Sequence, residues 1–490
     1  MLCGCVQNVQ KEKEYTSFVQ AEFKDPDNTF RSVPFYSLND SLSEKELVRQ
    51  LKLMKEGGFG GAFLHSRIGL LIPYLSEEWF HMMEVGVKAC QELEIDAWFY
   101  DEDKWPSGFA GGIIPNQHID FRSRTLIREP KGNKVADGDS ILYEDSSYQY
   151  VCYVDKMGQP WYNGTCWVDL MNPEMVKAFI ACSYQPYIDR FAGMPFVKGI
   201  FTDEPQISPR VKGEAGSVSY SPYMDLTFKK LWGYDLYPVL PALFDEVGDW
   251  RTVRLHYYRT VAYCMDQAFS KQIGDYCAAN DLIWTGHYNG ENGPTSTMLN
   301  EGNFSQQFRR MQVPGIDALG LGYNTVHNAK VNTSTANQYG ILRRISELFG
   351  ISGHNMSFED RMWITAWHTI MGVNMMCPHL YLYSMKGARK RDYPPTISHH
   401  QPYWSQNKLF EEYSARLCYF ATVGKPKAEV CILSPLESDY LDTLPQGVEA
   451  KERPQWDSRY EAILKQLMGL QINSDMGDEQ LISEIGSVEE

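Results

Sequence analysis

The sequence predicts an α/β protein built as a (β/α)8 TIM barrel, and three observations support this fold class. Short apolar runs alternate with helical patterns eight times over about 400 residues. Several of these runs end in carboxylates, which is typical of strands that meet at the catalytic face of such a barrel. No glycine-rich phosphate-binding fingerprint follows the first run, and this disfavours the alternative of an open, doubly wound sheet.

Eight apolar runs are the expected barrel strands, and helix-start signals lie between them. Ser41 with Glu44 predicts a capping box at the start of the first helix. Further helix starts are expected at Ser76, at Asn172 before Pro173, and at Ser357 with Asp360. The expected strands are Ser32–Tyr36, Gly60–His65, Ile95–Tyr100, Phe196–Glu204, Leu282–His287, Pro314–Leu319, Tyr339–Glu347 and Asn374–Tyr381.

The expected barrel occupies residues 30–425 and follows an N-terminal lead of residues 1–29. A β-rich insertion is expected after the third strand, over about residues 115–170, because short apolar runs alternate there with Gly, Asp and Asn. The pattern changes towards the C-terminus. Residues 426–490 predict either a partial α/β domain or a cap packed on the barrel.

Composition limits the partners that we expect. The 490 residues carry a formal net charge of −16, which argues against nucleic acid and against anionic membrane surfaces as partners. Aromatic residues make up 13 % of the chain, and this proportion suits a protein that stacks aromatic rings on sugars. No apolar run approaches ~18 residues, so we expect no transmembrane segment. The oligomeric state is left open.

The N-terminus leaves two interpretations of the compartment. As written, it lacks the basic start and the apolar stretch of a signal peptide, which favours the cytoplasm. However, Leu2–Cys5 resembles the end of a bacterial lipoprotein signal. A true start upstream of Cys5 would instead predict a periplasmic or lipid-anchored protein.

Two glutamates are the candidate catalytic residues. Glu204 ends the fourth expected strand and Glu347 ends the seventh, and in a closed barrel these strands lie across the mouth from each other. Glycoside hydrolysis needs two carboxyl groups that flank the scissile bond, one of which protonates the leaving oxygen. The alternatives are a solvated strand end for Glu204 and a structural ion pair with Arg343 or Arg344 for Glu347.

Further side chains near the expected strand ends are candidates for substrate binding. Polar groups there would contact sugar hydroxyls, and Trp105 would stack on a sugar ring. Structural roles remain as alternatives: a satisfied buried histidine, a loop with local ion pairs, or a packed turn. The polar candidates are Asp101, Glu102, Asp203, His287, Glu291, His379, Tyr383, Arg389 and Asp392.

The sequence requires no cofactor, and it places no metal site. It contains no HxH or HExxH spacing, which are the usual arrangements of histidine ligands. A metal-dependent hydrolase that uses Asp101, Glu102 and His287 is nevertheless a third hypothesis, and sensitivity to chelators would distinguish it from a metal-free glycosidase.

Seven short segments, in order along the expected barrel, carry a resemblance to a known family. The most specific is the loop DEDKWPSGFAGG. With the other six, it makes the chain resemble the bacterial α-L-rhamnosidases of glycoside hydrolase family 106 and related proteins. The segments are Gly69–Phe80, Asp101–Gly112, Phe201–Pro205, Thr285–Asn292, Pro314–Leu319, Arg344–Gly350 and Gly372–Ser384.

The resemblance implies hydrolysis of a terminal α-L-rhamnose, or a related deoxy-sugar, from glycans or glycosides. Two glutamates would act with inversion. Matched motif by motif, Glu204 would be the general acid and Glu347 the general base. Some family members carry calcium near the site, which the sequence does not place here. Family members are usually longer and have β-sandwich domains around the barrel. A non-catalytic carbohydrate-binding barrel, or an inactive fragment of a larger glycosidase, is therefore the alternative.

Overall fold

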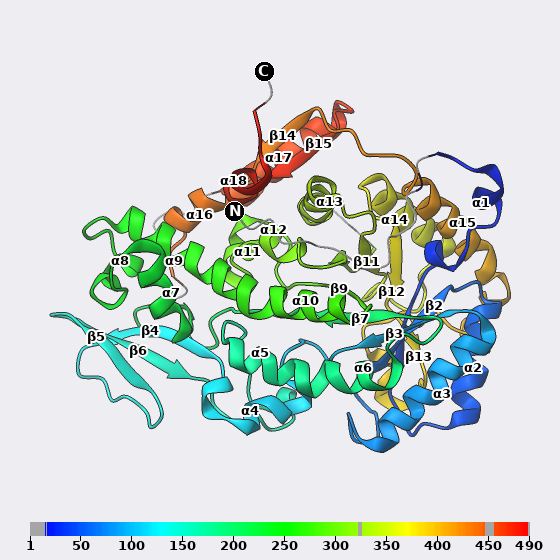
Figure 1. The fold of residues 1–490 in the computed structure, drawn as a ribbon, viewed down its shortest axis with the longest axis horizontal. Coiled ribbons are helices and arrows are strands. Elements are labelled where there is room, and N and C mark those ends of the chain that lie inside the picture. The colour runs from blue at the N-terminus through cyan, green and yellow to red at the C-terminus, as the bar shows by residue number, and fades with distance from the viewer. Residues whose placement is uncertain (1–14, 16, 322–325, 446–454, 489–490) are drawn as a thin grey trace.

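The computed structural model describes residues 15, 17–321, 326–445 and 455–488, and it confirms the (β/α)8 barrel (Figure 1). The parallel sheet has the order β12-β11-β10-β9-β7-β3-β2-β1-β13. β12 and β13 follow each other closely in the chain and together form the eighth strand position. Because β13 pairs with β1 while β12 pairs with β11, the sheet closes on itself.

The barrel strands lie close to the expected positions. The first strand begins at Phe35 rather than Ser32, and the seventh begins at Ile345, because Tyr339 is the last residue of a helix. The eighth expected strand, Asn374–Tyr381, is divided into two short strands. The strands are β1 (Phe35–Leu38), β2 (Gly61–Ser66), β3 (Asp96–Tyr100), β7 (Val197–Asp203), β9 (Ile283–His287), β10 (Val313–Ala318), β11 (Ile345–Leu348), β12 (Met375–Pro378) and β13 (Tyr381–Leu382).

Helices surround this barrel in Figure 1. A π-helical turn, Asp266–Ser270, joins α9 to α10 in the long helical segment that follows the fourth barrel strand. The helices are α1 (Gln20–Lys24), α2 (Glu44–Glu56), α3 (Glu77–Leu93), α4 (Ile113–Gln117), α5 (Pro173–Phe179), α6 (Gln185–Phe191), α7 (Tyr223–Trp232), α8 (Pro241–Phe244), α9 (Trp250–Met265), α10 (Lys271–Ala279), α11 (Pro294–Asn300), α12 (Phe304–Phe308), α13 (His327–Tyr339), α14 (Phe358–Ile370) and α15 (Asn407–Phe420).

Three of the four expected helix starts are confirmed. Ser76 accepts a hydrogen bond from the Trp79 N–H, Asn172 caps α5, and Ser357 forms a complete capping box with Asp360. The prediction at Ser41 was wrong, because α2 begins after Ser43. The preceding Asp40 instead accepts hydrogen bonds from Ser384 and Arg389, which belong to the loop after β13.

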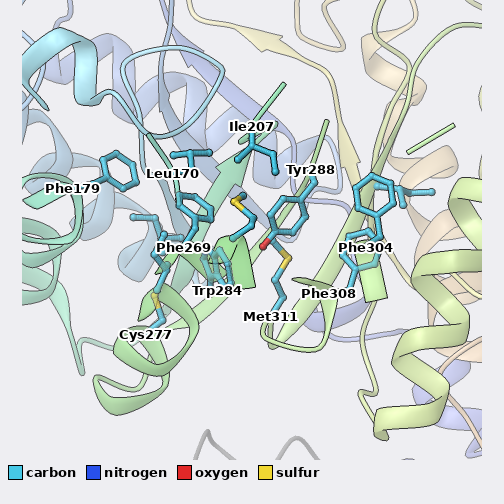
Figure 2. Close-up of a cluster of buried hydrophobic side chains, with 14 of the residues drawn as sticks. Leu170, Phe179, Ile207, Phe269, Cys277, Trp284, Tyr288, Phe304, Phe308 and Met311 are labelled. Carbon is cyan, nitrogen blue, oxygen red and sulfur yellow. The ribbon is translucent and has the colours of Figure 1, made fainter. Parts of the chain in front are cut away.

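Two apolar layers hold the barrel together. The inner layer consists of large side chains that point from the strands into the barrel, among them Phe63, Trp98, Phe201 and Ile345. The outer layer lies between the strands and the helices. Figure 2 shows part of it around Trp284 of β9, where aromatic and sulfur-containing side chains of several helices meet. Burial on both faces explains why the strands read as continuous apolar runs.

The expected insertion forms an antiparallel sheet beside the barrel. Its order is β5-β6-β4-β8, with β4 (Arg124–Pro130), β5 (Ser140–Glu144) and β6 (Tyr148–Val154) from the insertion. The fourth strand, β8 (Ser217–Tyr220), comes from the chain after β7. The sheet therefore ties the insertion to the segment that follows β7, where Glu204 lies.

Residues 430–445 and 455–485, here called the C-terminal unit, pack on the outside of the barrel near α9, α11 and α13 (Figure 1). The unit consists of β14 (Val430–Leu433), α16 (Leu436–Asp442), α17 (Trp456–Gly469), β15 (Ser474–Gly477) and α18 (Glu479–Ile485). Its two strands pair in parallel. The lipoprotein-like segment Leu2–Cys5 lies outside the described residues. Within the described part, we find no helix that is both long and apolar enough to cross a membrane.

Candidate active site

The carboxyl ends of four adjacent strands bring acidic side chains and one histidine together. Strand register places Asp203 of β7 beside His287 of β9, and Asp317 of β10 beside Glu347 of β11. Asp203, His287 and Glu347 are buried, and Asp317 is half-buried. Because parallel strands in a barrel end at the same face, residues far apart in the sequence form one cluster.

His287 lies at the centre of this cluster. Its Nε2 is 2.9 Å from Glu347 Oε2 and 3.4 Å from Asp203 Oδ1. Its Nδ1 is 3.9 Å from Glu291 Oε1. The hydroxyl of Tyr100 donates a hydrogen bond of 2.6 Å to the other oxygen of Asp203. The imidazole is therefore at hydrogen-bond distance from Glu347 and close to two further carboxyl groups, and only 1 % of its side chain is exposed.

Glu204 follows β7 directly and has a backbone φ of +46°. A non-glycine residue is rarely left-handed, and such strain is concentrated at functional sites. Its N–H donates to the His287 carbonyl oxygen at 3.1 Å, which fixes the backbone beside the cluster. Burial raises the pKa of the Glu204 carboxyl to about 8; the charges of Asp203 and Asp317 act in the same direction, while His287 opposes them.

Other carboxyls of the cluster are shifted in the same direction. Burial raises the pKa of Glu347 well above its usual range; Asp203 adds to this shift, and Arg67 opposes it. Burial and the Glu347 charge likewise raise the pKa of Asp317. Glu291 is also buried, and its Oε2 accepts a hydrogen bond from the Asp317 N–H at 2.9 Å. Burial therefore favours the protonated forms of these carboxyls.

Arg67 is a basic residue near the site that sequence reasoning missed. It follows β2, its side chain is 3 % exposed, and it forms a bidentate ion pair with Asp392 at 2.8 and 2.9 Å. The Arg67 charge acts to lower the pKa of Glu347, and the Asp203 charge acts to raise the pKa of Arg67. An arginine directly after an apolar barrel strand was the available signal, since such positions face the same end of the barrel as the acidic residues.

The candidates after the eighth strand separate into two groups. His379 reaches the cluster, because its Nε2 is 4.0 Å from Glu347 Oε1. The others make contacts with the protein: Asp392 with Arg67, Arg389 with Asp40 at 3.2 Å, and the Tyr383 hydroxyl with the Ser43 N–H at 3.0 Å. Contact of these side chains with a sugar stays a prediction.

The acidic pair at the end of β3 organises the loop that follows it. The two oxygens of Asp101 accept hydrogen bonds from the hydroxyls of Ser107 and Tyr184, both at 2.5 Å. The carboxylate of Glu102 accepts four backbone N–H groups of the same loop, from Asp103, Gly108, Ala110 and Gly111. Burial raises the pKa of Glu102, whereas the backbone N–H groups act in the opposite direction. Both side chains are fully buried.

The loop after β3 is bound to the strand that carries Glu204. Ser107 donates its N–H to the Asp203 carbonyl oxygen at 2.7 Å and accepts the Asp203 N–H on its hydroxyl at 2.8 Å. Trp105 in this loop lies beside Trp161 of the insertion, with ring centroids 5.1 Å apart. The Trp161 Nε1–H donates to the Trp105 carbonyl oxygen at 3.0 Å. Sequence reasoning singled out Trp105 but missed Trp161.

The cluster also contains donor atoms that could hold a metal ion. One ligand atom each of Asp203, His287 and Glu347 lies within 4.8 Å of the others. Calcium, which the family resemblance implies, prefers six to eight oxygen ligands, whereas this group combines two carboxylates with an imidazole. The group therefore does not fit calcium. It resembles more closely the mixed nitrogen and oxygen ligands that zinc accepts.

Comparisons with solved structures show what the fold is similar to. The rhamnosidase from Novosphingobium sp. PP1Y superposes with a TM-score of 0.64 at 12 % identity, covering 95 % of this chain and 64 % of that one. A β-galactosidase from the psychrophilic Marinomonas ef1 gives 0.57 at 11 % identity, covering 91 % and 70 %. Gan42B, a GH42 β-galactosidase from G. stearothermophilus, gives 0.57 at 12 % identity, covering 95 % and 67 %.

These comparisons define the class of fold. The chain is a (β/α)8 barrel of the type that solved glycosidases have, and it spans about two thirds of the length of the rhamnosidase. No protein-family model matches the chain, and no curated protein matches its sequence. At 11–12 % identity the likeness shows the fold alone, so activity and substrate must be argued from the site.

Proposed function

We propose that this protein is a glycoside hydrolase that removes a terminal α-L-rhamnose, or a related deoxy-sugar, from glycans or glycosides. One observation carries the proposal. Glu204 directly follows β7 and Glu347 lies in β11, at the same face of the barrel. Burial raises the pKa of both carboxyls, but Glu347 differs in having His287 Nε2 at 2.9 Å and the opposing charge of Arg67. Two carboxyl groups in unlike environments are what acid and base catalysis at a glycosidic bond requires.

Glu204 is the proposed general acid. With its pKa raised to about 8, the carboxyl is largely protonated at neutral pH. It can then give this proton to the glycosidic oxygen as the bond to the anomeric carbon breaks. Burial is the largest cause of the shift, and the neighbouring Asp203 sustains it because a second negative charge nearby is unfavourable.

Glu347 is the proposed general base. Burial and Asp203 favour its protonated form, but two groups favour the carboxylate: His287, whose Nε2 lies at hydrogen-bond distance, and the Arg67 charge. In the carboxylate form, Glu347 takes a proton from a water molecule as that water attacks the anomeric carbon. A single displacement of this kind inverts the anomeric configuration.

The choice of sugar rests on resemblance. The seven matching segments indicate the rhamnosidases of family 106, and a rhamnosidase is among the proteins whose fold is similar. The half-buried rings of Trp105 and Trp161 offer apolar faces beside the loop that is tied to Asp203. Aromatic faces of this kind suit the apolar side of a deoxy-sugar.

A panel of p-nitrophenyl glycosides, headed by the α-L-rhamnoside, tests the proposal. We expect release from one glycoside by the wild type, and reduced release by Glu204→Gln and by Glu347→Gln, with melting temperatures close to the wild-type value. Proton NMR of the first product should show the anomer of inverted configuration. If the folded wild type hydrolyses no glycoside of the panel, the protein is instead a carbohydrate-binding barrel or an inactive fragment.

A metal-dependent hydrolase is the second candidate, because the atoms of Asp203, His287 and Glu347 lie close enough to share an ion. This group differs from the one expected from sequence, since Asp101 and Glu102 are occupied by their own loop. Dialysis against EDTA followed by assay separates the two candidates. The glycosidase proposed above keeps its activity, whereas a metal-dependent hydrolase loses it and recovers it with added zinc.

A further inference from the structure

Two barrel helices next to the candidate active site begin without side-chain caps of their own. α11 follows Gly293 and α13 follows Val326, and neither residue offers a side-chain hydrogen bond to its helix. The first N–H groups of a helix have no partner inside the helix, so they must be satisfied from elsewhere. These helices follow β9 and β10, the strands that carry His287 and Asp317.

Helix α17 of the C-terminal unit supplies the missing partners. The two carboxylate oxygens of Glu461 accept the N–H groups of Val326 and His327, at 2.7 and 3.1 Å. One oxygen of Asp457 accepts the N–H of Thr295 at 3.0 Å. Asp457 and Glu461 are four residues apart, so they share one face of α17. Negative charge at a helix N-terminus is also favoured by the helix dipole.

The contact between α17 and the barrel is close. A Cβ atom placed on Gly293 would lie 2.7 Å from Asp457 Cγ, so only glycine leaves room for the carboxylate at this position. The ring of Tyr460 packs edge-on against His327, with centroids 6.0 Å apart. Elsewhere the unit is held by contacts that involve side chains, such as the Met476 N–H to the Ser334 hydroxyl at 2.8 Å and the ion pair of Glu437 with Arg259. Figure 1 shows the unit along α11 and α13.

A continuous series of contacts leads from α17 to the catalytic cluster. His327 is buried, and its Nδ1 lies 3.0 Å from the carbonyl oxygen of Glu291. Burial lowers the pKa of His327, so the ring is neutral and Nδ1–H donates to that carbonyl. Glu291 in turn accepts the Asp317 N–H and lies beside His287. The series ends at the hydrogen bond between His287 and Glu347.

We propose that helix α17 is a positioning element of the active site, in which Glu461 and Asp457 cap α13 and α11 and thereby hold Glu291 and His287 in place for Glu347. The C-terminal unit is then part of the catalytic machinery as well as a cover for the barrel surface. The kinetic part of this inference rests on the function proposed above, whereas the structural part does not. Neither Glu461 nor Asp457 touches the substrate.

The test compares two carboxylates of the same unit. Glu461→Ala removes the cap of α13, and Glu461→Gln keeps one acceptor oxygen. Glu437→Ala is the matched control, because Glu437 forms a bidentate ion pair with Arg259 of α9, at 2.6 and 2.7 Å, away from the cluster. Hydrogen exchange followed by mass spectrometry reports on residues 288–303 and 326–339. Steady-state assays on the substrate found above give kcat and KM.

We expect Glu461→Ala to raise exchange in both segments about ten-fold and to lower kcat about ten-fold, because misplacing a catalytic group by a fraction of an ångström slows the reaction. KM should stay within about two-fold, and Glu461→Gln should lie between Glu461→Ala and the wild type. Glu437→Ala should leave kcat and both segments unchanged. A merely stabilising contact predicts equal effects of Glu461→Ala and Glu437→Ala, and that result overturns the inference.

The two proposals fail in different ways. If the wild type hydrolyses no glycoside, the proposed function fails, and the exchange measurement alone decides the inference. Unchanged exchange in residues 288–303 of Glu461→Ala then rejects it, because the cap would not hold the loop that carries Glu291. Active wild type with unaltered kcat in Glu461→Ala rejects the positioning role while the proposed function stands. If Glu461→Ala is too unstable to measure, Asp457→Asn takes its place. We then expect the same rise in hydrogen exchange, centred on residues 288–303, and the same fall in kcat.

Discussion

Two acidic pairs of this protein look alike in sequence but have different surroundings in the structure. Asp101 and Glu102 follow the apolar strand β3, whereas Asp203 ends the apolar strand β7 and Glu204 follows it. The first pair is fully buried, and its oxygens accept hydrogen bonds from its own loop and from Tyr184. The second pair faces His287 and the other acidic side chains of the cluster.

The residues that follow each pair explain the difference. After Glu102 the chain is rich in glycine, and it folds back so that four backbone N–H groups point at the carboxylate. After Glu204 comes Pro205, which has no N–H to offer, and the chain leaves in a strained, left-handed turn. A carboxylate at a barrel strand end is therefore structural where the loop supplies donors, and available for chemistry where it does not.

The largest expected effects separate the acid from the base. With a p-nitrophenyl leaving group, which needs little protonation, Glu204→Gln should lose about 10-fold in kcat/KM. With a sugar or alkyl leaving group it should lose about 1,000-fold. Glu347→Gln should lose about 1,000-fold on both substrates, because water activation is needed for each. Rates on the two substrate types would be measured side by side. Equal losses on both substrates in Glu204→Gln would mean that Glu204 is not the acid.

A smaller effect is expected at the histidine between the acidic side chains. His287→Ala should lower kcat about 100-fold and move the acidic limb of the pH profile to higher pH. The direction follows because loss of a donor at Nε2 disfavours the carboxylate of Glu347 and raises its pKa. Tyr100→Phe, which removes only the hydrogen bond to Asp203, serves as the milder comparison. A structural role for His287 would lower kcat without moving the limb.

The pH profile of the wild type tests the environment of the second pair. Because the pKa of Glu204 is about 8, kcat/KM should fall as the pH rises through about 8 and the acid loses its proton. Asp203→Asn removes a negative charge that raises this pKa, so the basic limb should move to lower pH. A basic limb that stays in place in Asp203→Asn would contradict the coupling of the two carboxyls.

The smallest expected effect concerns the aromatic pair at the loop after β3. Trp105→Ala and Trp161→Ala should each raise KM about five-fold with little change in kcat, since a stacked ring contributes about 1 kcal/mol. Trp363, an exposed tryptophan on α14, provides the control, and Trp363→Ala should leave KM unchanged. Inhibition by free sugars, measured in parallel, reports the same contact. An increase in KM in all three variants would show that the effect is not specific to Trp105 and Trp161, and would contradict their proposed contact with the sugar.

Much of the barrel could be predicted from sequence, because each strand is buried on both faces and reads as an apolar run with a clear end. The catalytic candidates Glu204 and Glu347 could be placed at strand ends for the same reason. Their roles remain proposals. The helix start at Ser41 could not be placed correctly, because its neighbour Asp40 is bound by Ser384 and Arg389, which are 344 and 349 positions away in the chain.

Long-range partners account for the rest. Arg389 and Asp392 were expected to bind sugar hydroxyls or, alternatively, to form local ion pairs in their loop, yet Asp392 pairs with Arg67, 325 positions away in the chain. The position of Arg67 directly after a strand was a signal that it lies at this face, but it does not show that its partner is Asp392. His287 was expected to contact sugar hydroxyls, whereas its place between Asp203 and Glu347 depends on the register of three strands. Sequence periodicity predicts the strands but does not determine which ends meet.

The most direct measurement compares Glu102→Gln with Glu204→Gln for melting temperature and kcat in the same experiment, on a glycoside with a sugar leaving group. An amide at position 102 would set its own N–H groups against backbone donors, and each buried donor left unpaired costs about 1–3 kcal/mol. We therefore predict a clearly lower melting temperature and a retained kcat for Glu102→Gln, and the reverse for Glu204→Gln. Loss of kcat in Glu102→Gln without loss of stability, together with full activity in Glu204→Gln, would contradict the account.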